Sequence, residues 1–528
     1  MPPNIILISP HDDQLAVNAS SSILMGDWLG DWNVTTLLKS PFYSIFLAVS
    51  KLIGISPLIL THILILVIQY LLAGALVKLL KIKKKYFHSF EFLIYLFLSL
   101  NPALFTSDFS RVYRISLTTL LVMSIFLIGL KINLTIYEEN RGLFSKKLFV
   151  LYSMFGFTSG LAIITRDDSI PFVAVFTTLI LIAISYKCFR SNLSLHVKLF
   201  TKMLIIPLTI LVSMVVPIAS ISIANEFKYG FFGVNDYSQG YFSKSIKAWA
   251  DVDNGRDARN GILISEGQRQ AVYEISPTAK RLESGLSFEP GQGWKGPMCQ
   301  TTGICDEFGA AWIPFAIRDA AASAAGLNSE RNFQFFFKQI FQDISRACES
   351  GRLSCSKTSS ATGLLNLRDG TRSGLFSYSL KFGSSFLVPW QTNKFEVFQN
   401  QNISPEVLNS WKSGTGLEPS ATSTSSNLKQ LRFFLELLSL IYGVIVPVLF
   451  LLSVISLVLN SWLRSHALVT LVQFALLLSL LSFLILYGLI SASWGFLAEV
   501  SLYGAIAQPL FLIFILIGSI GLYKRFRT

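Results

Sequence analysis

The sequence predicts a polytopic α-helical membrane protein with about nine spans and an α+β domain outside the membrane. Of its 528 residues, 52% are hydrophobic and only 14% are charged, which is too apolar for a soluble globular protein. The mean hydropathy of +0.54 agrees with this. Nine apolar runs have about the length that a helix needs to cross roughly 30 Å of hydrocarbon, and one long polar segment, 225–432, interrupts them.

The net charge of +13 is concentrated in short loops between the apolar runs, so it does not indicate a nucleic-acid-binding surface. Every second loop is basic, and a single orientation places all of these loops in the cytoplasm. We therefore expect the N-terminus and the segment 225–432 outside the membrane and the C-terminus in the cytoplasm. The basic loops contain residues 81–88, 141–147, 187–202, Arg464 and 524–527.

Residues 1–56 are expected to form an acidic outer loop that ends in a short helix. The apolar segment 42–53 is too short to span the membrane, and we interpret it as a helix lying in the interface. The alternative is half of a longer, kinked span. Six spans then follow in 57–224 and three in 433–528. In order, the expected spans are 57–80, 89–106, 115–133, 148–165, 170–186, 203–224, 433–460, 467–488 and 502–522.

The segment 225–432 is expected to fold as one small α+β domain. Residues 330–349 place phenylalanine and isoleucine on one face at helical spacing. Residues 376–390 alternate and are rich in aromatic side chains, which indicates one or two strands. The polar run 420–427 is typical of a linker back to the membrane.

Four of the five cysteines, Cys299, Cys305, Cys348 and Cys355, fall in this outer segment. Cysteines in an oxidising compartment indicate two disulfides. Zinc is the alternative, although neither pair has the spacing of a structural zinc site. We favour Cys299 with Cys305 and Cys348 with Cys355, because each pair closes a short loop; three pairings are open on sequence alone.

The expected spans contain almost no ionisable residue between their ends. His62 is the main exception, and we interpret it as a hydrogen-bonded core residue rather than a proton relay. Ion-coupled carriers usually place charges near mid-membrane, so this pattern argues against such a carrier. The sequence also lacks the glycine-rich Lys-Ser/Thr motif of ATP-binding loops.

Ionisable residues gather instead in three expected outer loops. The first contains Asp12 and Asp13, the second is SDFSRVYR (107–114), and the third is TRDDS (165–169). Short loops at one face can bring carboxylates and guanidinium groups together. A carboxylate can deprotonate an acceptor hydroxyl, and an arginine can bind a phosphate with a bidentate fork. Transfer of a sugar from a lipid phosphate requires both.

Each cluster also has a purely structural interpretation. The acidic pair fits a solvated N-terminal tail, and the arginines of 107–114 fit interfacial anchors that snorkel to lipid headgroups. Asp168 or Ser169 fits a cap of the helix that begins at residue 170. Trp28 and Trp32 fit an aromatic belt better than a sugar-stacking platform.

Several stretches resemble bacterial membrane proteins of the GT-C glycosyltransferase class. Those proteins have an acidic motif in the first outer loop, and their uncharacterised members add a Lys-x-Pro-x-Tyr segment before an apolar helix. The similarity is spread over residues 11–360. The stretches are HDDQL (11–15), GDWLGDWNVTTLLKSPFYSIFLA (26–48), RVYR (111–114), TRDDS (165–169) and IPFAIRDAA (313–321).

The resemblance implies a polyprenyl-phosphate-linked sugar donor, a glycan, lipid or protein acceptor, and transfer outside the bacterial inner (plasma) membrane. It also implies an outer-loop aspartate as base, here Asp12 or Asp13. Some enzymes of the class need a divalent cation and others do not, so the metal requirement stays open. The expected substrate-binding residues are Lys39, Arg111, Arg114, Arg166, Asp167 and Asp168.

One departure from the class concerns the start of the chain. The class usually has a membrane helix before the acidic motif, whereas ten residues precede His11 here. Either the chain begins late or the protein has lost this element. Two non-enzymatic functions also fit the sequence: a carrier or flippase for lipid-linked saccharides, and an envelope scaffold whose outer segment binds a partner. A flippase needs a polar path across the membrane, and the expected spans show little sign of one.

Overall fold

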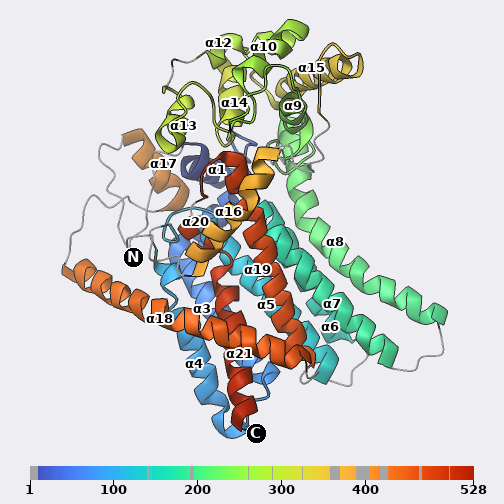
Figure 1. Cartoon of the computed structure of the whole chain (residues 1–528), viewed down its shortest axis with the longest axis vertical. Coiled ribbons are helices and arrows are strands. Elements are labelled where there is room, and N and C mark those ends of the chain that lie inside the picture. Colours follow the sequence, from blue (N-terminus) through green and yellow to red (C-terminus); the bar gives the residue numbers. More distant parts are fainter. Residues whose placement is uncertain are drawn as a thin grey trace.

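The protein is a bundle of long helices with a group of shorter helices at one end (Figure 1). The computed structural model describes residues 10–106, 108–138, 143, 145–190, 196–259, 261–287, 289, 291–323, 325–356, 369–387, 405–416, 426–462, 467–498 and 500–527. Within these residues, eight helices contain a segment that is long and apolar enough to cross a membrane. The protein is therefore an integral multi-pass membrane protein.

The long helices differ in how far the rest of the protein covers them. The apolar part of α5 is 89% buried, whereas those of α8 and α18 are only 22% buried, as expected for helices that face lipid. The bundle is thus built around α5. The eight helices are α3 (Pro57–Leu79), α5 (Ile115–Glu138), α6 (Lys146–Thr165), α7 (Ile170–Arg190), α8 (His196–Tyr229), α18 (Ser426–Trp462), α19 (Ala467–Trp494) and α21 (Gln508–Arg527).

The prediction of one continuous span over 89–106 is wrong. The chain forms α4 (Phe87–Ser99) and then the 3₁₀ helix η3 (Pro102–Phe105). The 13 residues of α4 rise about 20 Å, which is less than the thickness of the hydrocarbon. Pro102 explains the break, because proline cannot donate a backbone hydrogen bond inside a helix. The Asn101 side chain instead accepts from the backbone N–H of Ala103 at 3.1 Å.

Side chains of α3 contact the carbonyl groups near this break. Gln69 Nε2 donates to the carbonyl of Leu98 at 3.1 Å, and His62 Nε2 lies 3.3 Å from the carbonyl of Leu104. Non-helical backbone at membrane depth is tolerated where protein groups satisfy it in this way. His62 therefore lies in a hydrogen-bonded core position, as expected.

The N-terminal region is more ordered than the expected acidic loop. It forms η1 (Pro10–Gln14), α1 (Leu15–Leu24) and α2 (Phe42–Ile53). The bounds of α2 are those predicted, and its 12 residues are too few to span a bilayer. The helix α1 was not predicted from its serine-rich sequence. Trp411 Nε1 donates to Gln14 Oε1 at 2.7 Å just before α1, so a distant segment helps to hold it.

The domain expected outside the membrane, which we call the outer domain, is helical among the described residues, so the prediction of an α+β domain is wrong. Among the described residues the bridge between Val252 and Cys355 is isolated and no strand forms. The predicted helix 330–349 is confirmed as α15, and Phe333 and Phe337 pack with Phe242 in the domain core. The helices are α9 (Gly240–Ala250), α10 (Glu266–Ile275), α11 (Pro277–Lys280), α12 (Glu283–Leu286), α13 (Lys295–Thr302), α14 (Ile313–Ser323) and α15 (Glu330–Glu349).

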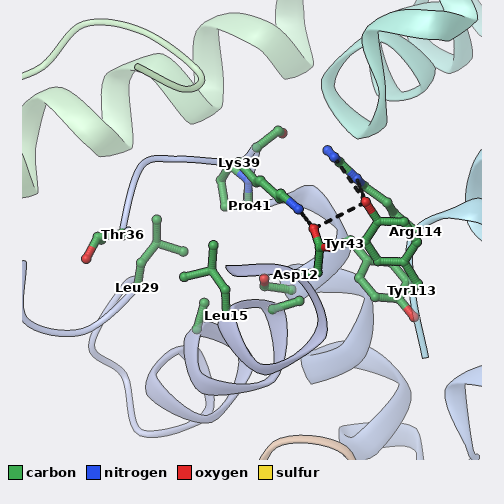
Figure 2. Close-up of a pocket in the computed structure, with 13 residues that line it drawn as sticks. Asp12, Leu15, Leu29, Thr36, Lys39, Pro41, Tyr43, Tyr113 and Arg114 are labelled. Atoms are coloured by element: carbon green, nitrogen blue, oxygen red, sulfur yellow. Dashed lines mark hydrogen bonds and ion pairs between the residues drawn. The ribbon is translucent and has the colours of Figure 1, made fainter. Parts of the chain in front are cut away.

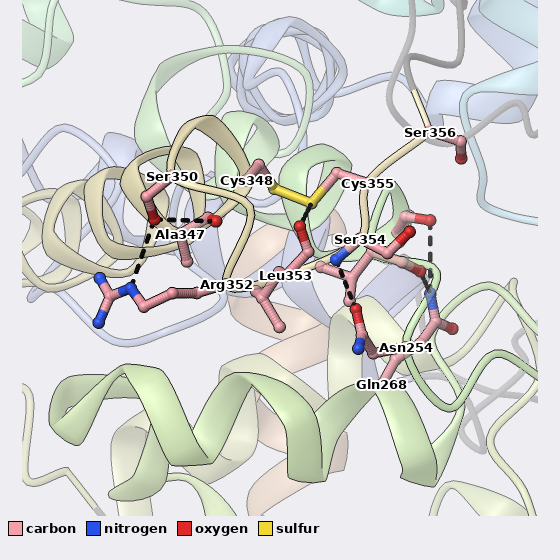
Figure 3. Close-up of a disulfide and its surroundings, with 12 residues drawn as sticks. Asn254, Gln268, Ala347, Cys348, Ser350, Arg352, Leu353, Ser354, Cys355 and Ser356 are labelled. Carbon is pink, nitrogen blue, oxygen red and sulfur yellow. Dashed lines mark hydrogen bonds between the residues drawn. A yellow bond between two sulfur atoms is a disulfide. The ribbon is translucent and has the colours of Figure 1, made fainter.

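Two disulfides close local loops of this domain, with the pairings that we favoured. Cys299 is bonded to Cys305, and Cys348 is bonded to Cys355. Figure 3 shows the second bond at the end of α15, where the following loop turns back. The backbone N–H of Ser354 in that loop donates to Asn254 Oδ1 at 2.7 Å. The bond therefore fixes the return of the chain onto the segment after α9.

The helices α16 and α17, described within 369–415, pack outside the core of the outer domain, α16 against the membrane helix α19 and α17 against α1 and α2. The strands expected in 376–390 are wrong for 376–387, which belong to α16 (Asp369–Leu387); 388–390 lie outside the described residues. Phe382 of α16 stacks on Tyr487 of α19 with ring centroids 5.2 Å apart. The helix α17 (Pro405–Thr415) packs beside α1. Most of the expected linker, 420–425, is also outside the described residues.

The described basic segments 81–88 and 524–527 lie together at the end of the bundle away from the outer domain. Lys524 Nζ donates to the carbonyl of Leu80 at 2.6 Å, which joins the C-terminal helix to the basic 81–88 loop. In Figure 1 the C-terminus and α4 lie at the bottom, and the outer domain lies at the top. These two basic segments thus lie at one end of the bundle, as the prediction of a common side requires. The side of the membrane on which each end lies, and the division at 56, 224 and 432, stay predictions.

Candidate active site

Residues from the three expected outer clusters meet at the domain end of the bundle. Asp13 in η1 accepts from Arg111 Nε at 2.7 Å, across 98 residues of sequence. Arg114, from the same loop as Arg111, donates through Nη1 to the carbonyl of Thr165 at 3.4 Å. Thr165 directly precedes Arg166 of the third cluster. The loops are thus connected by polar contacts.

The two neighbouring aspartates differ in exposure. The Asp13 side chain is 0% exposed, which excludes a solvated tail, whereas the Asp12 side chain is 32% exposed. Arg111 Nη2 lies 3.8 Å from Asp12 Oδ2, so the guanidinium approaches both carboxylates. Burial disfavours the charged form of Arg111, but the charge and hydrogen bond of Asp13 outweigh burial and raise its pKa. Asp13 therefore holds Arg111 in place.

Asp12 lies on the wall of a small cavity, opposite Lys39 (Figure 2). Lys39 Nζ forms an ion pair with Asp12 Oδ1. The cavity volume is about 20 Å³, which leaves room for about one water molecule. A larger ligand must therefore separate these side chains. The wall residues are Asp12, Leu15, Ala16, Ala19, Leu29, Thr36, Lys39, Ser40, Pro41, Tyr43, Ser44, Tyr113 and Arg114.

Lys39 lies near other cations as well as beside its carboxylate partner, Asp12. Burial lowers the pKa of Lys39, and the nearby guanidinium groups of Arg114, Arg111 and Arg166 lower it further. The ion pair with Asp12 opposes this effect. An anion that entered the cavity would relieve the repulsion among these cations. The cavity wall therefore carries more positive than negative charge.

Tyr113 lies at the centre of these charges, and the sequence analysis did not select it. Its ring lies 4.7 Å from the Arg111 guanidinium, 5.4 Å from that of Arg114 and 5.5 Å from Lys39 Nζ. Its hydroxyl donates to Asp12 Oδ1 at 3.4 Å. Burial raises the pKa of Tyr113, but the surrounding guanidinium groups outweigh burial and lower it. Its place within the RVYR stretch was the signal that could have identified it.

Arg166 forms a second buried ion pair beside this cavity. Its Nη2 lies 2.6 Å from Asp168 Oδ2 and donates to the Tyr487 hydroxyl at 3.1 Å. The Tyr487 hydroxyl also donates to Asp168. Asp168 is thus an ion-pair partner and not merely a helix cap. Asp167 is exposed next to it.

The outer domain holds the first loop through a buried arginine. Arg318 Nε donates to the carbonyl of Val34 at 2.5 Å, and Arg318 Nη1 lies 2.8 Å from Asp236 Oδ1. The guanidinium lies 4.9 Å and 4.7 Å from the ring centroids of Phe242 and Phe333. Arg318 belongs to the IPFAIRDAA stretch, but no local signal placed it against residue 34.

The two tryptophans of the first loop donate to polar partners. Trp32 Nε1 donates to Glu330 Oε2 at 2.8 Å, and Trp28 Nε1 donates to Asn225 Oδ1 at 2.9 Å. These contacts use the polar edge of each indole to dock the loop. They position the chain that leads to Lys39.

The described residues do not fit a metal ion. None of the described His, Cys, Asp and Glu side chains form a group of three or more that could hold one. The Asp12, Asp13 and Asp168 carboxylates lie against Lys39, Arg111 and Arg166 instead. We therefore derive no step through a metal.

A scan against known protein families and a search of curated proteins gave no match. A search of solved structures found the crystal structure of ArnT from Cupriavidus metallidurans in the apo state. The sequences are 13% identical, the TM-score is 0.27, and the alignment covers 96% of this chain and 73% of that chain. This similarity is too low to assign a fold family or an activity.

Proposed function

We propose that this protein is a membrane glycosyltransferase that moves a sugar from a polyprenyl-phosphate carrier to an acceptor at the outer face of the membrane. The observation that carries the proposal is the cavity in which Asp12 faces Lys39 and Arg114, with Arg111 behind it. A base for the acceptor and cations for the phosphate are then within one site. The motif resemblance is consistent with this chemistry.

The proposed reaction separates Lys39 from Asp12. The donor phosphate binds to Lys39 and the guanidinium groups of Arg111 and Arg114, which frees the Asp12 carboxylate. Asp12 accepts the proton of the acceptor hydroxyl, and the hydroxyl oxygen bonds to the anomeric carbon of the sugar. The bond from that carbon to the phosphate oxygen breaks, and its electron pair leaves with the polyprenyl phosphate. The fixed cations stabilise this developing charge.

Within this proposal Asp13 is a positioning residue and Asp12 is the base. Asp13 is wholly buried against Arg111, so an acceptor cannot reach it. Arg166 and Asp168 support the site from the α6–α7 turn, where Arg166 acts on Lys39 and Tyr113 by its charge. Asp167 is exposed at the same turn and is proposed to orient the acceptor.

The test is transfer of labelled sugar from a polyprenyl-phosphate donor in reconstituted liposomes. Asp12→Asn should lower turnover by about 10²–10⁴-fold, the usual contribution of a general base. Asp27→Asn is the matched control, because Asp27 pairs with Lys228 at 2.5 Å in the same loop but does not line the cavity. Wild-type turnover in Asp12→Asn would rule out Asp12 as the base. A wild-type protein that binds the donor without transferring sugar would favour a carrier or scaffold.

A further inference from the structure

A second cavity lies between α6 and α8, beside a close contact of the two helices. A Cβ atom at Gly156 or Gly160 would clash with the carbonyl oxygens of Ile210 and Met214. The two glycines are four residues apart, so they lie on one face of α6 and let the backbones touch. Towards the start of α6, Tyr152 and Phe149 follow on from these glycines and line the cavity.

The cavity has a volume of about 280 Å³, close to the lower end for small-molecule pockets. Phe149 of α6 and Ile205 and Ile206 of α8 form apolar walls, and Thr209 adds a polar group. Phe149 is 51% exposed and Ile205 is 45% exposed, so the cavity opens to the membrane side of the bundle. Pro207 lies within α8 at this level, where proline bends a helix.

The charge at this end of the cavity is positive. Lys146 lines the cavity at the first residue of α6, and Lys147 is exposed beside it. Lys147 and Lys78 both act on Lys131 as like charges, so basic side chains of neighbouring helices gather here. Apolar walls topped by a cation match a molecule with acyl chains and an anionic headgroup. A free phosphate would make no favourable contact with the apolar walls.

We propose that this cavity binds an anionic phospholipid, with its phosphate on Lys146 and an acyl chain between Phe149 and Ile205. The site lies at the basic end of the bundle, opposite the cavity of Asp12. It is independent of sugar transfer. A lipid there would fill the cavity between α6 and α8.

The test uses the purified full chain in detergent with phosphatidylglycerol or phosphatidylcholine, and native mass spectrometry measures the bound fraction. Wild type should retain phosphatidylglycerol preferentially. Lys146→Gln should weaken this binding about fivefold, the factor for one interfacial cation. Lys147→Gln, the matched control, removes an adjacent lysine that does not line the cavity and should have little effect. Thr209→Phe should reduce retention by filling the cavity without changing its charge.

Two outcomes of this experiment would contradict the proposed lipid site. Equal losses in the two lysine variants would mean that the lipid follows the general basic surface, and the proposal would fail. Equal retention of both lipids by wild type would mean an apolar crevice without headgroup selection, which also overturns it. Circular dichroism and gel filtration identify a misfolded variant, in which case Thr209→Phe decides. Sugar-transfer activity does not enter the readout.

Discussion

Glu330→Gln should change how the stability of the outer domain depends on pH. Glu330 begins α15 and is 1% exposed, and its carboxylate accepts from Trp32 Nε1 and from Gln334 Nε2. The buried carboxylate of Asp236, paired with Arg318, lies close enough to act on it. The carboxylates of Glu330 and Asp236 are therefore both buried near one guanidinium group, that of Arg318. Burial, and then the charge of Asp236, raise the pKa of Glu330 to about 7.

The magnitude follows from the pKa difference between the folded and unfolded chains. The ordinary value is 4.5 and the folded value is about 7, and each unit corresponds to about 1.4 kcal/mol. Because the folded state binds the proton more tightly, the free energy of unfolding should fall as pH rises from about 4.5 to 7. The total loss is at most about 3.5 kcal/mol. Above the folded pKa the contribution of Glu330 no longer changes.

Glutamine keeps an acceptor for Trp32 but cannot titrate. The unfolding midpoint of each protein would be followed by tryptophan fluorescence from pH 5 to 8, and the difference between wild type and Glu330→Gln isolates this group. As pH rises, the unfolding midpoint of Glu330→Gln should increase relative to that of wild type. Glu266→Gln is the matched control, because Glu266 also follows a serine cap at the start of a helix but is 58% exposed. Parallel profiles for wild type and Glu330→Gln would refute the reasoning.

Two further predictions concern the disulfides and the topology. Replacing Cys348 and Cys355 by serine should lower the stability of the outer domain by roughly 2–3 kcal/mol, as expected for a short closed loop, and denaturant unfolding would measure it; an unchanged midpoint would contradict this. A single cysteine at position 84, in a chain without other cysteines, should react with an impermeant thiol reagent only after the membrane is opened, because the 81–88 loop is predicted to be cytoplasmic. Labelling from outside would reverse the orientation.

Local sequence was sufficient for elements whose structure depends on local pattern. The bounds of α2 and α15 and both disulfide pairings followed from apolar spacing and short loops. The break before η3 was missed, although Asn101-Pro102 is a strong turn signal within an apolar run. The high hydropathy of the whole run favoured a continuous span and outweighed this turn signal in the prediction.

Other elements depend on contacts between residues that are far apart in the sequence, and local patterns do not predict such contacts. The aromatic residues of α16 suggested strands, but Phe382 stacks on Tyr487, a residue of another helix, and this packing favours the helix. Arg318 reaches the carbonyl of Val34 across 284 residues. The outer clusters could be assigned to one face from topology, whereas Tyr113 and Arg318 required the folded chain.

The different environments of Asp12 and Asp13 lead to a last prediction. Consecutive residues of a helical turn point in different directions, so one carboxylate can face the cavity while the other faces Arg111. Asp13→Asn should therefore destabilise the protein, since removing one partner of a buried ion pair typically costs about 3–5 kcal/mol. It should also weaken donor binding, because Arg111 loses its fixed position, and Arg111→Ala should share that loss of donor affinity.

Asp12→Asn should behave in the opposite way. Its side chain is partly exposed, so the melting temperature should stay near that of wild type while turnover falls. Melting temperature, turnover and the KM for the donor, measured on both variants, separate the role of Asp12 from that of Asp13. If Asp13→Asn lost turnover at an unchanged melting temperature and Asp12→Asn remained active, the base would be Asp13. The acceptor would then have to approach from the side of Arg111, and the cavity of Asp12 and Lys39 would not be the place of transfer.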